Sequence, residues 1–139
     1  MLRIILVEDN PADAQMMQTA LGHAGQPVEV VVLKDGRQAI DYLTHSNGAN
    51  VRAKHDLVLL DLNMPGLNGF DVLESVRACG DIRSLPIVVM SGSTNNADIE
   101  RSYELGANSY VMKGTRLQDI LNTGTQLVSY WSNCAKLPH

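Results

Sequence analysis

The sequence predicts an α/β protein whose parallel sheet is covered by helices on both faces. Two observations carry this prediction. Short apolar runs without polar alternation recur along the chain, as expected for strands buried on both faces, and segments with helical spacing separate them. The strand–helix unit occurs five times, and such alternation is typical of parallel sheets.

The clearest strand covers residues 57–61. Residues 57–60 are all apolar, the run ends on Asp61, and the nearby Pro65 cannot continue a β ladder. Asp61 is therefore expected at the carboxyl end of a central strand, the edge at which open α/β sheets bind ligands. The other expected strands are residues 4–7, 28–33, 86–91 and 109–112.

A helical segment follows each expected strand. Asn10 is expected to cap the first helix and Pro11 to begin it, and Gly106 is expected to end the fourth. The inward faces are marked by Ala14, Met17, Leu21 and Ala24, by Ala39, Ile40 and Leu43, by Phe70, Leu73 and Val76, and by Leu117, Ile120, Leu121, Gly124, Val128 and Trp131. Residues 45–55 are polar without a pattern and predict a long surface loop.

Composition narrows the class of protein. The 139 residues fit one domain, and a net charge of −4 without a basic run argues against a nucleic-acid surface. No apolar run is long enough to span a membrane and the start does not resemble a signal peptide, so a cytoplasmic location is expected. Cys79 and Cys134 are expected as reduced thiols. The histidines are expected on the surface and not as ligands: His23, His45, His55 and His139.

Polar side chains stand where four of the expected strands end, namely Glu8, Asp9, Asp61, Ser91 and Lys113. The carboxyl ends of parallel strands share one edge, so these side chains are expected to converge. Three crowded carboxylates repel one another, and Mg²⁺ relieves such repulsion with carboxylate and water ligands. The backbone carbonyl of Asn63 is a further candidate ligand.

This set of groups suits phosphoryl transfer. A metal ion and Lys113 offset the negative charge of the transferring group, and Ser91 can donate a hydrogen bond to it. Asp61 is then the nucleophile, and an acyl phosphate on its carboxylate is the expected product.

These residues resemble the receiver domains of two-component response regulators, and the resemblance covers essentially the whole chain. The family's acidic pair matches Glu8-Asp9, its phosphoacceptor motif matches Asp61-Leu62-Asn63-Met64-Pro65 with Gly69 following, its Ser/Thr matches Ser91, its Lys matches Lys113, and its aromatic switch position matches Tyr110. The resemblance implies a flavodoxin-like fold with strand order 2-1-3-4-5. It also implies phosphotransfer from a sensor histidine kinase to Asp61 and slow autodephosphorylation, so that the protein is a phosphoacceptor and not an enzyme.

A narrower resemblance links the chain to the small single-domain regulators of phytochrome kinases. It rests on residues 102–105, the loop at 45–55 and the tail with Ser129-Tyr130-Trp131 and Leu137-Pro138. Residues 1–139 are then expected to be one receiver domain without an effector domain, with output by protein contact. One position departs from the family, which usually has Lys-Pro after the fifth strand where this chain has Lys113-Gly114. The sequence leaves open whether that peptide bond is cis or trans.

Several alternatives stay open at this point. Glu8 and Asp9 could serve only as favourable charges at a helix N-terminus, and Tyr110 could serve only packing. A pseudo-receiver scaffold would use the fold without phosphorylation. A phosphatase with an aspartyl-phosphate intermediate is disfavoured because Asn63 stands where such enzymes usually have a second aspartate. A flavodoxin-like cofactor site is disfavoured because Glu8-Asp9 would repel a phosphate.

The last helix carries a second, partly apolar stripe of Leu127, Tyr130 and Cys134, with Leu137 beyond it. A helix that is apolar on two sides often has a second partner. We consider two explanations, a tail that folds back on its own domain and a surface for homodimerisation or kinase docking.

Overall fold

Strands and helices alternate along the chain. The structure, a computed structural model, describes residues 1–138. Its strands and main helices are β1 Leu2–Val7, α1 Pro11–Gly22, β2 Val28–Leu33, α2 Gly36–Thr44, β3 Asp56–Asp61, α3 Gly69–Ala78, β4 Ile87–Ser91, α4 Asn96–Glu104, β5 Ser109–Met112 and α5 Leu117–Ser129. Three short helical turns complete it, at His45–Asn47, Gly80–Ile82 and Tyr130–Cys134. The five predicted strand–helix units are confirmed.

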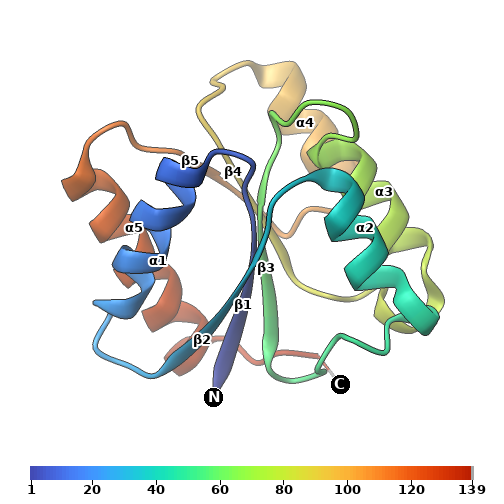
Figure 1. Ribbon diagram of the computed structural model, residues 1–139, viewed down its shortest axis with the longest axis horizontal. Coiled ribbons are helices and arrows are strands. Elements are labelled where there is room, and N and C mark those ends of the chain that lie inside the picture. The colour runs from blue at the N-terminus through green and yellow to red at the C-terminus, as the bar shows by residue number, and fades with distance from the viewer. Residues whose placement is uncertain (139) are drawn as a thin grey trace.

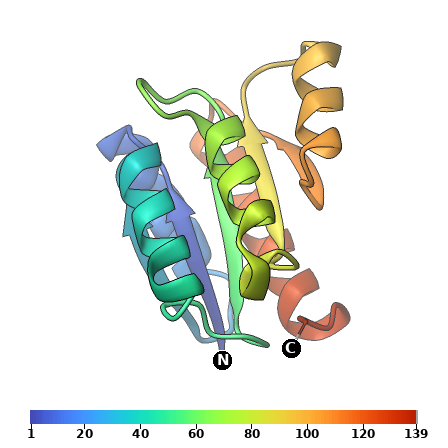
Figure 2. The same cartoon turned by 90° about the vertical axis from the view of Figure 1, so that its right-hand side faces the viewer.

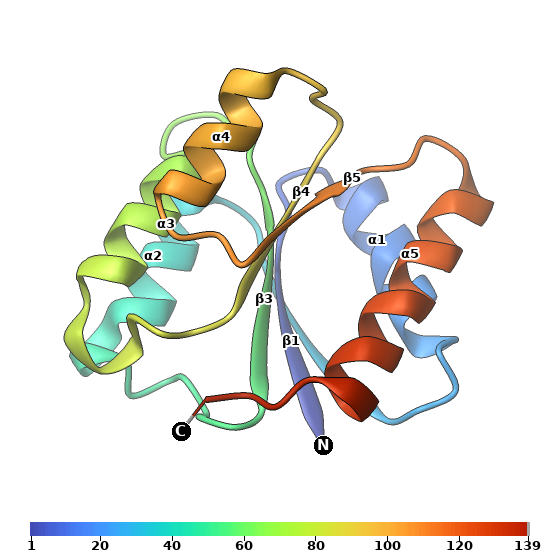
Figure 3. The same ribbon diagram turned by 180° about the vertical axis from the view of Figure 1, so that it is seen from behind.

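The strands form one sheet in the order β2-β1-β3-β4-β5, and every neighbouring pair is parallel. Helices α1 and α5 cover one face of this sheet, and α2, α3 and α4 cover the other (Figure 1). Figure 2 looks onto α2, α3 and α4 in front of the sheet, and Figure 3 shows the same three layers from behind. The predicted strand order and the helices on both faces are therefore confirmed.

The core lies on both sides of the central strands. Every residue of β1, β3 and β4 is buried, which explains why residues 4–7, 57–60 and 87–90 are continuous apolar runs in the sequence. Alternate residues face opposite ways: Ile5 and Val58 join the core under α2 and α3, whereas Ile4 and Leu57 join the core under α1 and α5. The rigid sheet that results fixes the positions of the residues at its carboxyl edge.

Helix α1 begins directly after the acidic pair because its first turn is capped. The side chain of Asn10 accepts hydrogen bonds from the backbone N–H groups of Ala12 and Asp13, and Pro11 stands at the first helical position. The backbone N–H of Asn10 in turn donates to Glu8 Oε2 at 3.3 Å. These local bonds hold the chain in a tight turn at the end of β1.

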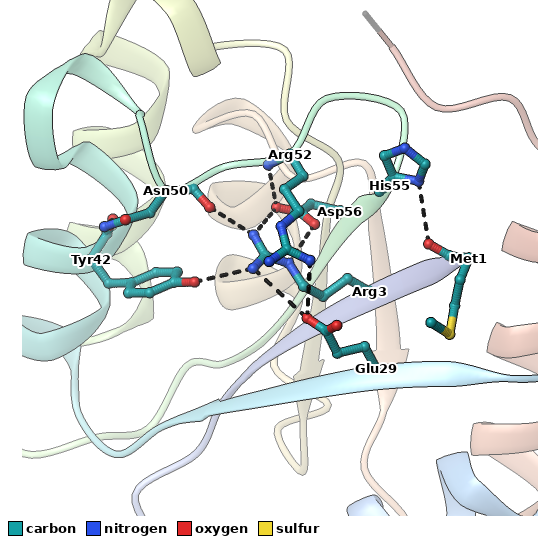
Figure 4. A network of polar contacts seen from close by, with 8 residues as sticks. All are labelled: Met1, Arg3, Glu29, Tyr42, Asn50, Arg52, His55 and Asp56. Carbon is teal, nitrogen blue, oxygen red and sulfur yellow. Dashed lines mark hydrogen bonds and ion pairs between the residues drawn. The ribbon is translucent and has the colours of Figure 1, made fainter.

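The predicted surface loop at residues 45–55 is more ordered than its composition suggests. It packs against a buried ion pair between β1 and β3, in which Arg3 Nε and Nη2 donate to the two Asp56 oxygens at 2.7 and 2.6 Å (Figure 4). Arg3 also donates to the backbone oxygen of Asn50 at 2.7 Å, and the backbone N–H of Arg52 donates to Asp56 at 2.7 Å. This network lies at the amino edge of the sheet, away from the acidic pair.

Two expectations for the last helix are wrong. Leu117, predicted in the core, is 53% exposed, and Leu127, predicted on an exposed second stripe, is only 9% exposed and packs in the core under α1 and α5. The helix ends in a π-helical turn at Tyr130–Cys134, which shifts the residues after it around the helix axis. Tyr130 and Cys134 stay exposed.

The tail beyond α5 folds back on its own domain. The backbone N–H of Lys54 donates to the carbonyl of Pro138 at 2.9 Å, and Leu137 packs against the same core as Leu127. Folding back is therefore the correct explanation for Leu137, whereas Leu127 is buried by the packing of α5 itself. The second stripe is reduced to Tyr130 and Cys134.

The remaining chain-wide expectations concern cysteines, histidines and membrane spans. Cys79 and Cys134 are both free thiols, as predicted. His23, His45 and His55 are exposed, and His139 lies outside the described residues. Within residues 1–138, none of the helices has the length and apolar character needed to cross a membrane.

Candidate functional site

The loops that follow β1, β3, β4 and β5 meet at one edge of the sheet, at the top of Figure 1. β1 and β3 are neighbours, so Glu8 and Asp9 come next to Asp61. One carboxylate oxygen from each of these three residues lies within 4.8 Å of the others. The predicted convergence of the acidic residues is confirmed in the geometry.

The acidic cluster is largely withdrawn from water. Glu8 is 4% exposed and Asp61 is 7% exposed, and Asp9 is half-buried. Burial and the nearby charge of Glu8 raise the pKa of Asp61 to about 7, against the opposing effects of Lys113 and the Asn63 N–H. A bound cation would offset the repulsion between the carboxylates of Asp61 and Glu8, so this cluster favours cation binding.

The donor set fits a hard divalent metal ion. Its members are carboxylates of Glu8, Asp9 and Asp61, which are the oxygen ligands that Mg²⁺ and Mn²⁺ accept. The backbone of Asn63 lies against the site, with its N–H donating to Asp61 Oδ1 at 3.3 Å. Its carbonyl as a fourth ligand stays a prediction.

In the loop after β3, the backbone of Gly69 lies close to the backbone of Asp61 and Leu62. Gly69 donates from its N–H to the Leu62 carbonyl at 3.1 Å. A Cβ at position 69 would lie 2.7 Å from the Asp61 carbonyl oxygen and 2.8 Å from Leu62 Cα, so a side chain here would push the loop outward. Glycine at position 69 thus keeps the turn after Asp61 tight and α3 close to it.

Lys113 reaches the acidic cluster from the end of β5. Its Nζ lies 2.5 Å from Glu8 Oε1 and 3.8 Å from Asp61 Oδ2. Burial lowers the pKa of Lys113, but the hydrogen bond to Glu8 and the charges of Asp61 and Glu8 outweigh it, so the pKa is raised overall. The side chain is therefore a fixed ammonium group, as phosphoryl transfer needs.

Asp13 is a member of this site that sequence reasoning missed. Its Oδ2 lies 3.2 Å from Lys113 Nζ, whereas Asp61 Oδ2 lies 3.8 Å from the same nitrogen. The signal was present as an acidic residue in the first turn of the helix that follows Glu8-Asp9. That signal is weak, because a carboxylate in a first helical turn is also what the helix dipole favours.

Ser91 is fully buried at the end of β4. It directly follows Met90, the residue that pairs with Asp61 on the neighbouring strand β3. Its Oγ accepts a hydrogen bond from the backbone N–H of Ser93 at 3.1 Å, and Asn63 Nδ2 lies 3.5 Å away. The hydroxyl therefore shapes the turn after β4 and also faces the loop after β3. Its hydrogen bond to a phosphoryl group stays a prediction.

Tyr110 connects β5 to the loop that follows Ser91. Its hydroxyl donates to the carbonyl of Ser93 at 2.9 Å, and its backbone N–H donates to the hydroxyl of Tyr103 at 3.1 Å. The half-buried ring thus does more than pack, because it holds the β4–α4 loop. Whether it changes rotamer stays untested.

The departure at Gly114 has a steric explanation. The peptide bond after Lys113 is trans, since residues 1–138 contain no cis peptide bond. A Cβ at position 114 would lie 2.4 Å from the Cβ of Asp119 in the first turn of α5. Proline carries such a Cβ, so this loop conformation excludes it.

The chain matches the family profile described as the response regulator receiver domain over residues 4–124. It is 33% identical over 135 residues to the response regulator Rcp1 of Synechocystis sp., with 97% of this chain and 92% of Rcp1 covered. It is 34% identical over 135 residues to the probable methanogenesis regulatory protein FilR2 of Methanothrix harundinacea, with 97% and 86% covered.

Two solved structures are similar to this chain in both fold and sequence. The phosphorylated cyanobacterial phytochrome response regulator RcpA has a TM-score of 0.87 and 37% identity, with 99% of each chain covered. The Mn²⁺-bound form of Rcp1 has a TM-score of 0.86 and 33% identity, with 100% of each chain covered. These relatives share both the length and the fold of this chain.

Proposed function

Because the chain belongs to the family of response regulator receiver domains, we propose that it accepts a phosphoryl group on Asp61 from a sensor histidine kinase. The observation that carries the proposal is the buried carboxylate of Asp61, held in one cluster with Glu8 and Asp9 while Lys113 lies 3.8 Å away. The protein acts as a signalling protein, and its own chemistry is limited to self-phosphotransfer and autodephosphorylation.

In this reaction the carboxylate of Asp61 attacks the phosphorus of a phosphohistidine. The P–N bond breaks, its electrons return to the donor imidazole, and an acyl phosphate forms on Asp61. Glu8, Asp9, Asp61 and the Asn63 carbonyl would hold Mg²⁺, which supplies charge neutralisation for the phosphoryl oxygens when bound. The metal assignment is supported by the donor set here and by the Mn²⁺-bound relative.

The residues of this chain prepare Asp61 for that attack. Burial removes competing water from the carboxylate, and Lys113 supplies a positive charge near the position of the incoming group. Ser91 offers a hydroxyl from the neighbouring strand. Asn63 stands two residues after the nucleophile and lacks a carboxyl for acid–base catalysis, which disfavours turnover as a phosphatase.

Output follows through the loop after β4. We expect the phosphorylated site to attract Ser91 and Lys113. Ser91 and Tyr110 both hydrogen-bond the backbone of Ser93, so a movement of Ser91 is expected to disturb the Tyr110–Ser93 hydrogen bond. This change would present a new protein-contact surface at residues 92–112. Hydrogen exchange that is identical in residues 92–112 with and without phosphorylation would remove the switch from the proposal.

The proposed donor is a phytochrome-type histidine kinase. The similarity to RcpA and Rcp1 along nearly the full length of each chain supports this choice. FilR2, named for methanogenesis, is equally similar in sequence, so a non-photoreceptor kinase is the second candidate. Phosphotransfer rates from a purified phytochrome kinase and from unrelated histidine kinases would separate the two.

The proposal also includes a homodimer through the exposed remainder of the α5 stripe, Tyr130 and Cys134. Leu127 is left out because it is buried in the core of its own chain.

A direct test uses a small phosphodonor and intact mass. The protein is incubated with acetyl phosphate and Mg²⁺, beside an Asp61→Asn variant and a sample without metal. The proposal expects the mass of one phosphoryl group on the first sample and no gain in the two controls. A wild-type protein that gains no mass would favour the scaffold alternative, in which the fold is used without phosphorylation.

A further inference from the structure

We infer that Asp13 is a positioning residue for Lys113, holding its ammonium at the sheet edge while Glu8 and Asp61 are engaged by metal and phosphoryl group. This inference rests on the proposed function and assigns a fourth carboxylate to the same site. It gives Asp13 a part in the chemistry that its place in a helical first turn does not require.

The contacts of Lys113 are the first support. Its Nζ lies within 4 Å of three carboxylates, at 2.5 Å from Glu8, 3.2 Å from Asp13 and 3.8 Å from Asp61. Two of these belong to the cluster whose oxygens lie within 4.8 Å of one another, and Asp13 does not. Asp13 is thus the partner of Lys113 that stands outside the expected ligand set.

Asp13 is also held firmly enough to act as an anchor. Its backbone N–H donates to the capping side chain of Asn10 at 3.1 Å, and the Ala14 N–H donates to the Asn10 carbonyl at 2.9 Å. These bonds fix the first turn of α1 directly after the acidic pair. The carboxylate is therefore tied to the same turn that positions Glu8.

The surroundings of the ion pair strengthen it. Asp13, Glu8 and Lys113 close over a small hollow that is otherwise lined mainly by apolar side chains, namely Met17, Met90, Met112 and Ile120. These apolar side chains limit the water that can screen the charge of Lys113 from that of Asp13 on this side. The side chain of Asp13 is 32% exposed, so water still screens part of the interaction and its expected effect is modest.

The balance of charge gives Asp13 its role. A divalent cation held by Glu8 and Asp61 would weaken the attraction that these two carboxylates offer to Lys113. Asp13, outside that group, would keep its full charge and remain 3.2 Å from the ammonium. Lys113 would then stay near Asp61 in the charged site instead of turning to solvent.

The competing explanation is that Asp13 only stabilises the N-terminus of α1. Stabilisation of a helix dipole changes the free energy of unfolding but does not depend on Lys113. Asp119, in the first turn of α5, provides a matched control because it makes no ion pair with Lys113 among the described residues.

The first arm of the test measures phosphorylation by acetyl phosphate at saturating Mg²⁺. Asp13→Asn is expected to lower the rate constant about two- to tenfold, Asp13→Glu to retain most of it, and Asp119→Asn to leave it unchanged. In a Lys113→Gln background the Asp13→Asn change should have no further effect. An undiminished rate in Asp13→Asn, or the same loss with and without Lys113, would overturn the inference.

The second arm needs no phosphorylation and separates this inference from the proposed function. The side-chain ¹⁵N resonance of Lys113 is recorded with Mg²⁺ and no phosphodonor. The wild type is expected to show an ammonium protected from exchange with water, and Asp13→Asn is expected to lose that protection. Equal protection in both proteins overturns the positioning role, whereas a wild type that is protected but never phosphorylated overturns the proposed function alone.

Discussion

The ammonium group of Lys113 lies 3.8 Å from the carboxylate of Asp61, just beyond direct hydrogen-bond distance. Its shortest contact is to Glu8, at 2.5 Å. A phosphoryl group on Asp61 would bring anionic oxygens within reach of Lys113, and the lysine would then exchange one partner for another. The position of Lys113 is therefore consistent with the proposed phosphorylation of Asp61.

Lys113 competes with a metal ion for Glu8, so its removal should have two opposite effects. We expect Lys113→Gln to bind Mg²⁺ about two- to tenfold more tightly, because a positive charge leaves the cluster. The same variant should be phosphorylated about ten- to a hundredfold more slowly, because the charge near the transferring group is lost. Calorimetry with Mg²⁺ and phosphorylation kinetics measure the two effects.

Lys34 provides the control for this prediction, because it is an exposed lysine just beyond the end of β2. Lys34→Gln should change neither quantity appreciably. Weaker Mg²⁺ binding in Lys113→Gln would show that the lysine supports the cluster and does not compete for it.

The buried charge of Asp61 should reduce stability at neutral pH. Its pKa in the folded chain is about 7, above the unfolded value of about 3.9, so the folded chain holds the proton more tightly. Stability is then highest below about pH 4 as far as this group is concerned, and it falls as the pH rises through about 7.

Asp61→Asn is accordingly expected to raise the free energy of unfolding by about 1–3 kcal/mol near pH 8 without metal, with little effect near pH 4. Urea denaturation at several pH values measures the difference. A gain that is constant across the pH range would assign the effect to something other than the charge.

The ion pair between Arg3 and Asp56 should matter for stability and not for phosphorylation. Both groups are buried, with the Asp56 side chain at 0% exposure (Figure 4). Asp56 begins β3 and Asp61 ends it, so the pair lies at the opposite edge of the sheet from Asp61. Asp56→Asn would leave the guanidinium of Arg3 without its anion and should cost about 2–4 kcal/mol.

Glu29→Gln is the matched control for Asp56→Asn, because the Glu29 side chain is 43% exposed and lies 4.0 Å from the same arginine. It should cost less than about 1 kcal/mol. Phosphorylation by acetyl phosphate, measured well below the melting temperature, should stay at the wild-type rate in both variants. A slower rate in Asp56→Asn would mean that the two edges of the sheet are coupled.

The homodimer part of the proposal depends on the exposed residue Tyr130. Tyr130→Glu should convert a wild-type dimer to a monomer in sedimentation experiments, because a charge would replace the ring at the interface. Leu117→Glu, at an equally exposed position near the start of α5, should leave the dimer intact. Unchanged mass in Tyr130→Glu, with a dimeric wild type, would remove the last helix from the interface.

The sheet and the acidic cluster could be predicted because both follow from local patterns. A strand buried on two faces is a continuous apolar run, and polar residues that end several such runs must meet if the strands are parallel. Asp61, Glu8 and Lys113 were found in this way. The strand order came from the family resemblance, since alternation alone does not fix it.

The contacts that were missed join segments far apart in sequence. Asp13 belongs to the site through a lysine one hundred positions away, and Asp56, the first residue of β3, pairs with Arg3 of β1. Leu127 was misplaced for a different reason. It lies seven positions after Ile120 and three after Gly124, so regular helical spacing already places it on the buried face of α5, although it is also spaced three positions before the exposed Tyr130.

The most direct test of the central claim identifies the phosphorylated residue itself. The protein is phosphorylated with acetyl phosphate and Mg²⁺, reduced with borohydride, and digested for peptide sequencing by mass spectrometry. Borohydride reduces an aspartyl phosphate to homoserine, so the account predicts homoserine at position 61 and intact aspartate at positions 9 and 13. Homoserine at another position, or none in a sample that carries a phosphoryl group, would contradict Asp61 as the phosphoacceptor.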